Sequence, residues 1–160
     1  MVVIADSSPL HYLVEIGHAE ILPTLFSRVV IPPQVAEELT HPHAPQAVRA
    51  FMAQTPSWLE IRVPVNMEDI ARLDLGERAA ISLACEMRPD FLLIDERLGR
   101  QAAVARNLVV IGTLGVLERA ANQGLINLAD SLNRLQQTRF HVAESLLEET
   151  IRRHEQNRNG

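Results

Sequence analysis

The chain has 160 residues, of which 47% are hydrophobic and 22% charged, which fits one folded globular domain and argues against extended disorder. No apolar run reaches the roughly 18 residues that a membrane helix needs. The start, Met1-Val-Val-Ile-Ala-Asp6, predicts a first strand and not a signal peptide, and the single cysteine, Cys85, excludes an internal disulfide and suits a reducing cytoplasm.

The net charge of −5 argues against nucleic-acid binding, since proteins that bind nucleic acids usually show a basic surface. However, all 15 basic residues are arginine, whose planar side chain suits phosphate groups. Acids that converge on a metal would also be neutralised locally by the ion. The charge therefore leaves nucleic-acid binding open.

The first half of the chain alternates short apolar runs with helical segments. Residues 2–5 predict a buried strand, Ser8-Pro9 opens a helix that ends near Gly17, and a short helix follows over about 18–26. Residues 29–31 predict the next strand, and two helices follow over 34–39 and 45–54. Residues 58–63 alternate as in an edge strand, and Asn66 is expected to cap a helix that reaches about Leu73.

The second half continues the alternation. It predicts helices over 77–87, 96–106 and 113–122, strands over 91–94 and 108–111, and a helical part over 127–155 that is interrupted near 138–141. Strands separated by helices imply right-handed crossovers. We therefore expect an α/β fold: a three-layer α/β/α sandwich with a central, mostly parallel sheet. It forms a single domain over 1–155, followed by a flexible tail over 156–160.

Two acids follow predicted strands directly. Asp6 comes after the first strand and Asp95 after the strand at 91–94, so both are expected at the carboxyl edge of the sheet, where ligands of such folds bind. If the strands are neighbours, the two like charges repel unless a cation such as Mg²⁺ bridges them. Each acid can equally be read as the cap of the helix that follows it.

Two glutamates border helix faces that point to the core. Glu38 follows the inward Val35 by three residues, and Glu77 begins a small and apolar helix, with Asp74 three residues before it. Glu38 can equally be a solvated surface residue, and Glu77 can simply compensate the helix dipole. Asp74 can cap this helix or support a site.

Taken together, these segments resemble the PIN-domain superfamily, and more narrowly a PIN-like family (DUF3368-type) that opens with Asp-Ser-Ser-Pro-Leu. The matching segments are Asp6-Ser7-Ser8-Pro9-Leu10, Ile31-Pro32 with Val35 and Glu38-Leu39, Leu73-Asp74-Leu75-Gly76-Glu77 with Ala80-Ile81, Leu93-Ile94-Asp95-Glu96 with Arg100, and Gly112-Thr113-Leu114-Gly115-Val116-Leu117. They span about residues 2 to 130, and their order and spacing carry the resemblance.

The resemblance implies a central first strand with the Asp95 strand beside it. It also implies that Asp6, Glu38, Glu77 and Asp95 converge on one or two ions, Mg²⁺ or Mn²⁺, with Glu96 as an extra ligand. Many PIN toxins carry an aspartate where this chain has Glu77. The implied activity is a metal-dependent endoribonuclease, a cytoplasmic hydrolase in which a metal-activated water attacks an RNA phosphodiester.

Four further residues are candidates for contact with RNA. Ser7 can hydrogen-bond a metal-bound water or a phosphate, and Arg97 and Arg100 can bind phosphates unless they form only a solvated helix face. Thr113 stands at a helix start, where it can contact phosphate or act as a simple cap.

The same residues argue against several other functions. Phosphatases that form an aspartyl-phosphate commonly place a second acid two residues after the nucleophile, where this chain has Ser8. They also need a lysine, and this chain has none. The lack of lysine disfavours phosphoacceptor receiver domains as well. No Gly-Lys pair exists for a P-loop. A non-catalytic PIN-like module that binds RNA or protein remains as the alternative. The expected partners are RNA, a second copy in a homodimer, and an antitoxin if the chain is the toxin of a toxin–antitoxin pair; no membrane is expected.

Overall fold

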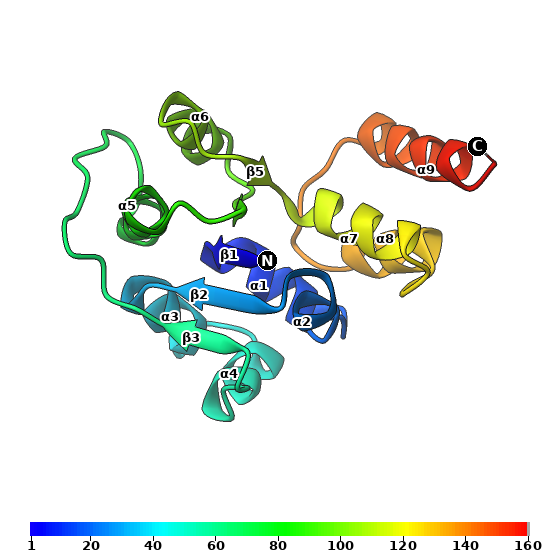
Figure 1. Ribbon diagram of the computed structural model, residues 1–160. Coiled ribbons are helices and arrows are strands. Elements are labelled where there is room, and N and C mark those ends of the chain that lie inside the picture. Colours follow the sequence, from blue (N-terminus) through cyan, green and yellow to red (C-terminus); the bar gives the residue numbers. More distant parts are fainter. Residues whose placement is uncertain (160) are drawn as a thin grey trace.

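The fold is known from a computed structural model that describes residues 1–159. Its centre is a five-stranded, fully parallel sheet with the strand order β3-β2-β1-β4-β5 (Figure 1). The strands are β1 (Val2–Ala5), β2 (Arg28–Ile31), β3 (Leu59–Ile61), β4 (Phe91–Leu93) and β5 (Val110–Ile111). The predicted α/β sandwich with a parallel sheet is thus confirmed, as is β1 as the central strand with β4 beside it.

Helices connect the strands. They are α1 (Ser7–Glu15), α2 (Ile21–Phe26), α3 (Pro33–Thr40), α4 (Gln46–Ala53), α5 (Leu75–Met87), α6 (Arg97–Ala105), α7 (Thr113–Asn122), α8 (Leu128–Gln136) and α9 (Glu144–Asn159). Helices α1, α3 and α4 pack against one another, and α5 packs against α6, β1 and β4. In Figure 1, α3 and α4 lie at the bottom of the view, α5 and α6 at the upper left, and α7, α8 and α9 on the right.

The direction of the chain across the sheet reverses between two strands. From β1 the chain moves outward to β2 and β3, and α5 then carries it back across the sheet to β4, from which it continues to β5. The neighbouring strands β1 and β4 therefore form a topological switch point. Ligands of open α/β sheets bind at the carboxyl ends of the strands at such a point.

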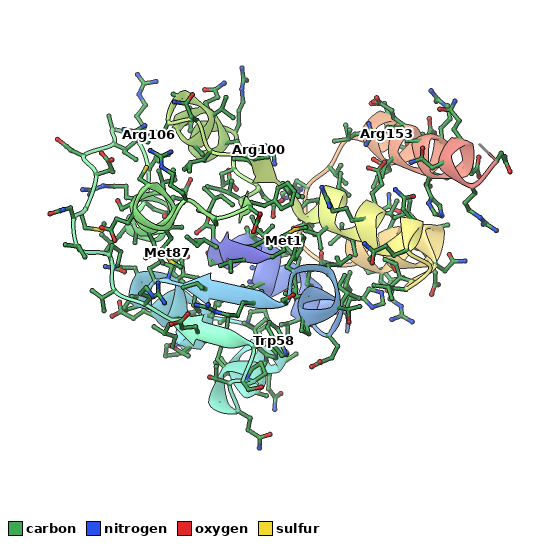
Figure 2. The ribbon with its side chains drawn as sticks, viewed as in Figure 1. Met1, Trp58, Met87, Arg100, Arg106 and Arg153 are labelled. Carbon is green, nitrogen blue, oxygen red and sulfur yellow. The ribbon has the colours of Figure 1, made fainter. Side chains whose placement is uncertain are left out.

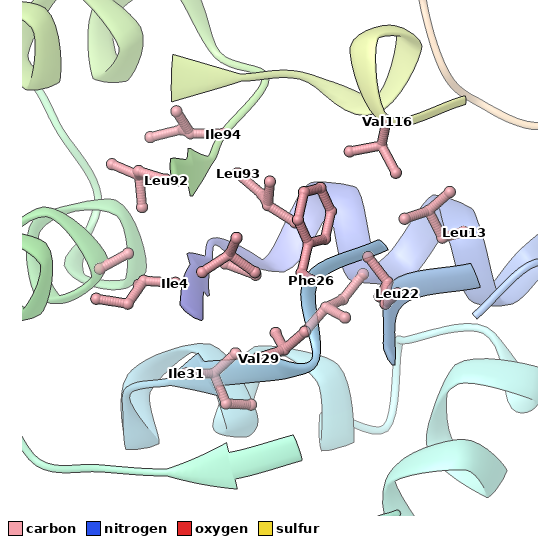
Figure 3. Close-up of a cluster of buried hydrophobic side chains, with 14 of the residues drawn as sticks. Ile4, Leu13, Leu22, Phe26, Val29, Ile31, Leu92, Leu93, Ile94 and Val116 are labelled. Carbon is pink, nitrogen blue, oxygen red and sulfur yellow. The ribbon is translucent and has the colours of Figure 1, made fainter. Parts of the chain in front are cut away.

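The inner strands are apolar, apart from Arg28 at the start of β2, because both faces of the sheet are covered. Ile4, Ile31, Leu92 and Leu93 are fully buried, and Figure 3 shows them with Phe26 and residues of α1 and α7 in one cluster. Figure 2 shows side chains in the space between the helices and the sheet. This packing fixes the ends of β1 and β4 and hence the residues that follow them.

Some local predictions were wrong. No helix forms over 66–73, because tertiary contacts bind this segment to α5: the backbone N–H of Asn66 donates to the Glu86 carboxylate (2.8 Å), and that of Glu68 donates to Ser82 Oγ (2.8 Å). Asp6, and not Ser8, takes the cap position of α1.

The C-terminal part is more helical than expected. Helix α9 continues to Asn159, so residues 156–159 are helical, and residue 160 of the predicted tail lies outside the described part of the chain. The predicted helical part at 127–155 and its interruption correspond to α8, α9 and the segment between them. No helix in the described residues is long and apolar enough to cross a membrane.

Candidate active site

Asp6 lies at the end of β1 and is 3% exposed. Its backbone N–H donates to the carbonyl of Leu93 on β4 (2.8 Å), which fixes the residue at the switch point. Its side chain makes no cap hydrogen bond, although it occupies the cap position of α1, and its Oδ1 atom is buried without a partner. A buried carboxylate oxygen without a hydrogen-bond partner destabilises the folded protein, so a bound cation or another ligand is expected at this atom.

The acids around Asp6 oppose its ionisation. Burial raises the pKa of Asp6 from 3.8 to about 7, and the nearby Ser7 amide acts in the opposite direction. Three neighbouring carboxylates add to the rise: Glu38, Asp74 and Asp95. The structure therefore brings acids from β1, α3, the start of α5 and the end of β4 to one place.

Glu38 is held by two small residues of other segments. The hydroxyl of Ser7 donates to Glu38 Oε2 (2.5 Å). Gly76 lies so close that an added Cβ atom would stand 2.0 Å from Glu38 Oε1, so any larger residue at this position would displace the Glu38 carboxylate. Although Glu38 is exposed as a whole residue, partial burial of its carboxylate and the charge of Asp74 raise its pKa.

Glu77 is 7% exposed and belongs to the first turn of α5. Asp74 caps this helix, because its Oδ1 accepts the backbone N–H of Glu77 (2.8 Å). Burial raises the pKa of Glu77, and the hydrogen bond and charge of Asp74 and the charge of Asp6 raise it further. Gly99 of α6 packs against the same carboxylate, since an added Cβ would lie 2.9 Å from Glu77 Oε2.

Asp95 is oriented by α7. Its Oδ1 accepts the backbone N–H of Thr113 (2.7 Å) and its Oδ2 accepts the Thr113 hydroxyl (2.7 Å). Burial raises the pKa of Asp95, whereas Thr113 and the charge of Arg100 lower it and Glu96 raises it. Asp95 thus accepts the first N–H of α7. The sequence had also allowed Asp95 to cap the helix that follows it, but this helix, α6, has no side-chain cap.

The four predicted contacts to RNA fall into two groups. Thr113 is fully buried and donates to Asp95, and Ser7 is partly buried and donates to Glu38, so both position acids. Arg97 is exposed and Arg100 is partly buried, and both line a groove. Arg100 also donates to the Ile94 carbonyl (2.9 Å), which holds its side chain beside the end of β4.

This groove has a volume of about 1380 Å³ and lies between α6, β5 and α7 on one side and the segment 139–153 on the other. It includes Asp95 and Glu96 and five arginines: Arg97, Arg100, Arg119, Arg139 and Arg153. Figure 2 shows Arg100 and Arg153 on opposite sides of the region between α6 and α9. Sequence reasoning did not single out the last three arginines, because they come from two distant helices and a loop that only the fold brings together.

The described residues contain no group of three or more His, Cys, Asp or Glu side chains that is already arranged around a common metal position. The chemistry of the acids nevertheless fits a hard divalent cation. They offer only oxygen donors, they raise one another's pKa, and the buried Asp6 Oδ1 has no partner. Asp74, expected from the sequence as a cap or a support, caps α5 and is a fifth acid near Asp6.

The comparisons agree with this architecture. No curated protein matches the chain. Among solved structures, it is similar to a PilT N-terminus domain protein from the hyperthermophilic archaeon Sulfolobus solfataricus, with 14% identity, a TM-score of 0.50 and coverage of 90% of this chain and 99% of that one. At this identity the likeness concerns the fold alone. The DUF3368 family model, described as a PIN domain, matches residues 2–156. PIN domains are generally nucleases, and by this match the chain belongs to the PIN-domain family.

Proposed function

We propose that this chain is a divalent-metal-dependent endoribonuclease. The observation that carries the proposal is the environment of Asp6: a buried carboxylate with an unpartnered oxygen, whose pKa is raised to about 7 by burial first and by the neighbouring acids in addition. Like charges so placed repel one another unless a proton or a cation neutralises them. Groups of like charges that destabilise the folded protein in this way are typical of catalytic centres.

The residues proposed to hold Mg²⁺ or Mn²⁺ are Asp6, Glu38, Glu77 and Asp95, with Glu96 as an additional ligand. When bound, such an ion makes water a stronger nucleophile and stabilises the charge that develops on a phosphodiester under attack. Asp74 orients the start of α5 through its bond to the Glu77 N–H. We assign to Asp74 a supporting role, because as the cap of α5 it fixes the position of Glu77.

The remaining residues position these acids and the RNA. Thr113 fixes both oxygens of Asp95, and Ser7 fixes one oxygen of Glu38, so neither acid needs to reorganise when a cation binds. Arg97 and Arg100 line the groove next to Asp95 and are proposed to bind phosphates of the RNA. These arginines offset the acids locally, which reconciles RNA binding with a net charge of −5.

The test is cleavage of a single-stranded RNA with Mg²⁺, with Mn²⁺ and with EDTA, by wild type, Asp6→Asn and Asp95→Asn. We expect cleavage only by wild type with metal. Because water and not the ribose 2′-hydroxyl is the proposed nucleophile, an RNA with a single 2′-deoxy nucleotide at the cleaved position should still be cut. Activity in EDTA, or equal activity of Asp6→Asn, would refute the proposal.

A second candidate function is a non-catalytic PIN-like module that binds RNA or protein. It is favoured by the lack, among residues 1–159, of three acids already arranged around one metal position. If Mn²⁺ leaves the melting temperature of the wild type unchanged while RNA still binds, this second function is supported and the nuclease is not.

The wider biology follows from the proposed activity. We propose a cytoplasmic enzyme that is the toxin of a toxin–antitoxin pair. An adjacent small gene for a DNA-binding protein with a basic tail, together with growth arrest on expression of wild type but not of Asp6→Asn, would support this. Growth unaffected by the wild type would argue for a stand-alone nuclease.

A further inference from the structure

One edge of the sheet, formed by β3, offers unpaired backbone groups. Among the described residues β2 is the only strand that pairs with β3. The Trp58 carbonyl accepts the Val29 N–H (3.0 Å), and the Arg62 N–H donates to the Ile31 carbonyl (2.9 Å), so residues 58 and 62 face β2. Because backbone direction alternates along a strand, residues 59, 61 and 63 direct their N–H and C=O groups outward.

These outward groups are available to another strand, with one exception. The Leu59 N–H already donates to the Pro56 carbonyl (3.1 Å). The N–H and C=O of Ile61, the N–H of Val63 and the C=O of Leu59 remain. Pro64 has no N–H and ends the stretch. An unpaired edge of this kind is a ready template for strand addition.

The side chains along this edge are apolar at every second position. Ile61, Val63, Val65 and Met67 are 49%, 69%, 83% and 38% exposed. We call these four residues the apolar stripe; Ile61 belongs to β3, and the other three lie in the segment that follows it. Such stripes mark surfaces that another chain covers.

Two charged residues alternate with this stripe. Arg28 binds the carboxylate of Glu60, and Arg62 Nη2 binds Glu60 Oε1 (2.9 Å). Both Glu60 and Arg62 remain substantially exposed, with 37% and 45% of their side chains accessible. Opposite charges two residues apart on an edge strand are complementary to a second copy of the same strand that runs antiparallel to it.

We propose that β3 pairs antiparallel with β3 of a second copy of this chain, across a two-fold axis at Ile61. Each Ile61 then faces its own copy in a hydrogen-bonded pair, and Leu59 faces Val63 of the second copy. Glu60 faces Arg62 of the second copy in the two non-hydrogen-bonded pairs, where side chains are closest. Opposite charges in such pairs are stabilising.

Other registers are less favourable. With the two-fold axis at Glu60 or at Arg62, that residue faces its own copy, so like charges lie opposite each other. With the axis between two residues, the backbone groups that point outward on one strand would face residues whose groups point inward on the other. The axis at Ile61 thus satisfies the backbone, the apolar stripe and the charges together. In the antiparallel dimer the carboxyl ends of the two sheets point in opposite directions, so both acidic sites stay open.

The test is the oligomeric state in solution, by light scattering on a size-exclusion column. We expect the wild type to be a dimer. Glu60→Arg and Arg62→Glu each set like charges opposite each other, so each is expected to raise the dimer dissociation constant by about tenfold or more. Mixed in equal amounts, the two variants should form a heterodimer, because every facing pair again carries opposite charges. This recovery cannot come from ion pairs within one chain.

A matched pair of variants locates the surface. Ile61→Lys should give a monomer, whereas Val104→Lys, at an apolar residue of α6 that is at least as exposed, should leave the dimer intact. If the wild type is a monomer, the proposal is overturned. Glu60, Arg62 and Pro64 would then protect the exposed edge of the sheet from pairing with other strands. A dimer that survives Ile61→Lys, or variants that fail to associate when mixed, would also overturn the proposal.

Discussion

Replacing Asp6 by asparagine should stabilise the metal-free protein. The folded protein holds the Asp6 proton up to a pH of about 7, whereas the ordinary pKa is 3.8. Folding therefore takes up a proton between these values, so this contribution to stability is complete below pH 3.8 and is lost as the pH rises through about 7. Asparagine has nearly the same shape, carries no charge, and can donate its N–H groups to the neighbouring carboxylates.

The size of the effect follows from the pKa difference. A shift from 3.8 to about 7 corresponds to at most about 4 kcal/mol of destabilisation once Asp6 is ionised. Between about pH 5 and about pH 8 the wild type should therefore lose about 2 kcal/mol more stability than Asp6→Asn. Urea denaturation in EDTA measures both proteins at both pH values.

The control is Asp69→Asn, which removes the charge of an exposed aspartate outside the cluster and should leave the pH dependence unchanged. Addition of Mn²⁺ at the higher pH should stabilise the wild type and not Asp6→Asn, which reverses their order. If metal-free Asp6→Asn is less stable than the wild type at about pH 8, the account of the cluster as repelling acids is wrong.

Two further substitutions test how the acids are positioned. Thr113→Val removes the hydroxyl bond to Asp95 and should cost about 1 to 2 kcal/mol of stability and about tenfold or more in Mn²⁺ affinity, whereas Thr113→Ser should keep both; equal affinities of the two variants would contradict this role. Gly76→Ala would normally favour a helix, but its Cβ displaces Glu38, so calorimetry should show weaker Mn²⁺ binding by about tenfold in a protein that still folds; unchanged binding would show that Glu38 is not a ligand.

The sequence could predict the parts of the site that depend on one strand each. Asp6 and Asp95 follow short apolar runs, and the alternation of strands and helices placed the ends of these strands at one edge of a parallel sheet. The structure has both strands as neighbours with this edge in common. The sequence also allowed Asp6 to cap α1, and the structure shows that its side chain makes no cap hydrogen bond and has an unpartnered oxygen.

Other parts depend on contacts between distant segments. Gly76 reads as a helix interruption, yet its lack of a side chain leaves room for the Glu38 carboxylate of α3 against α5. The segment 66–73 carries a good cap and first turn, but Glu86 and Ser82 of α5 bind its backbone and hold it outside a helix. A local pattern reports neither contact, because Glu38 belongs to another helix and the bonds to Ser82 and Glu86 span 14 and 20 residues.

The central claim is that these acids bind divalent ions, and a calorimetric titration with Mn²⁺ at about pH 8 tests it most directly. We predict binding by the wild type, none by Asp6→Asn, and release of protons that grows as the pH is lowered toward the raised pKa of Asp6. Absence of binding by the wild type, or equal binding by Asp6→Asn, would contradict the account.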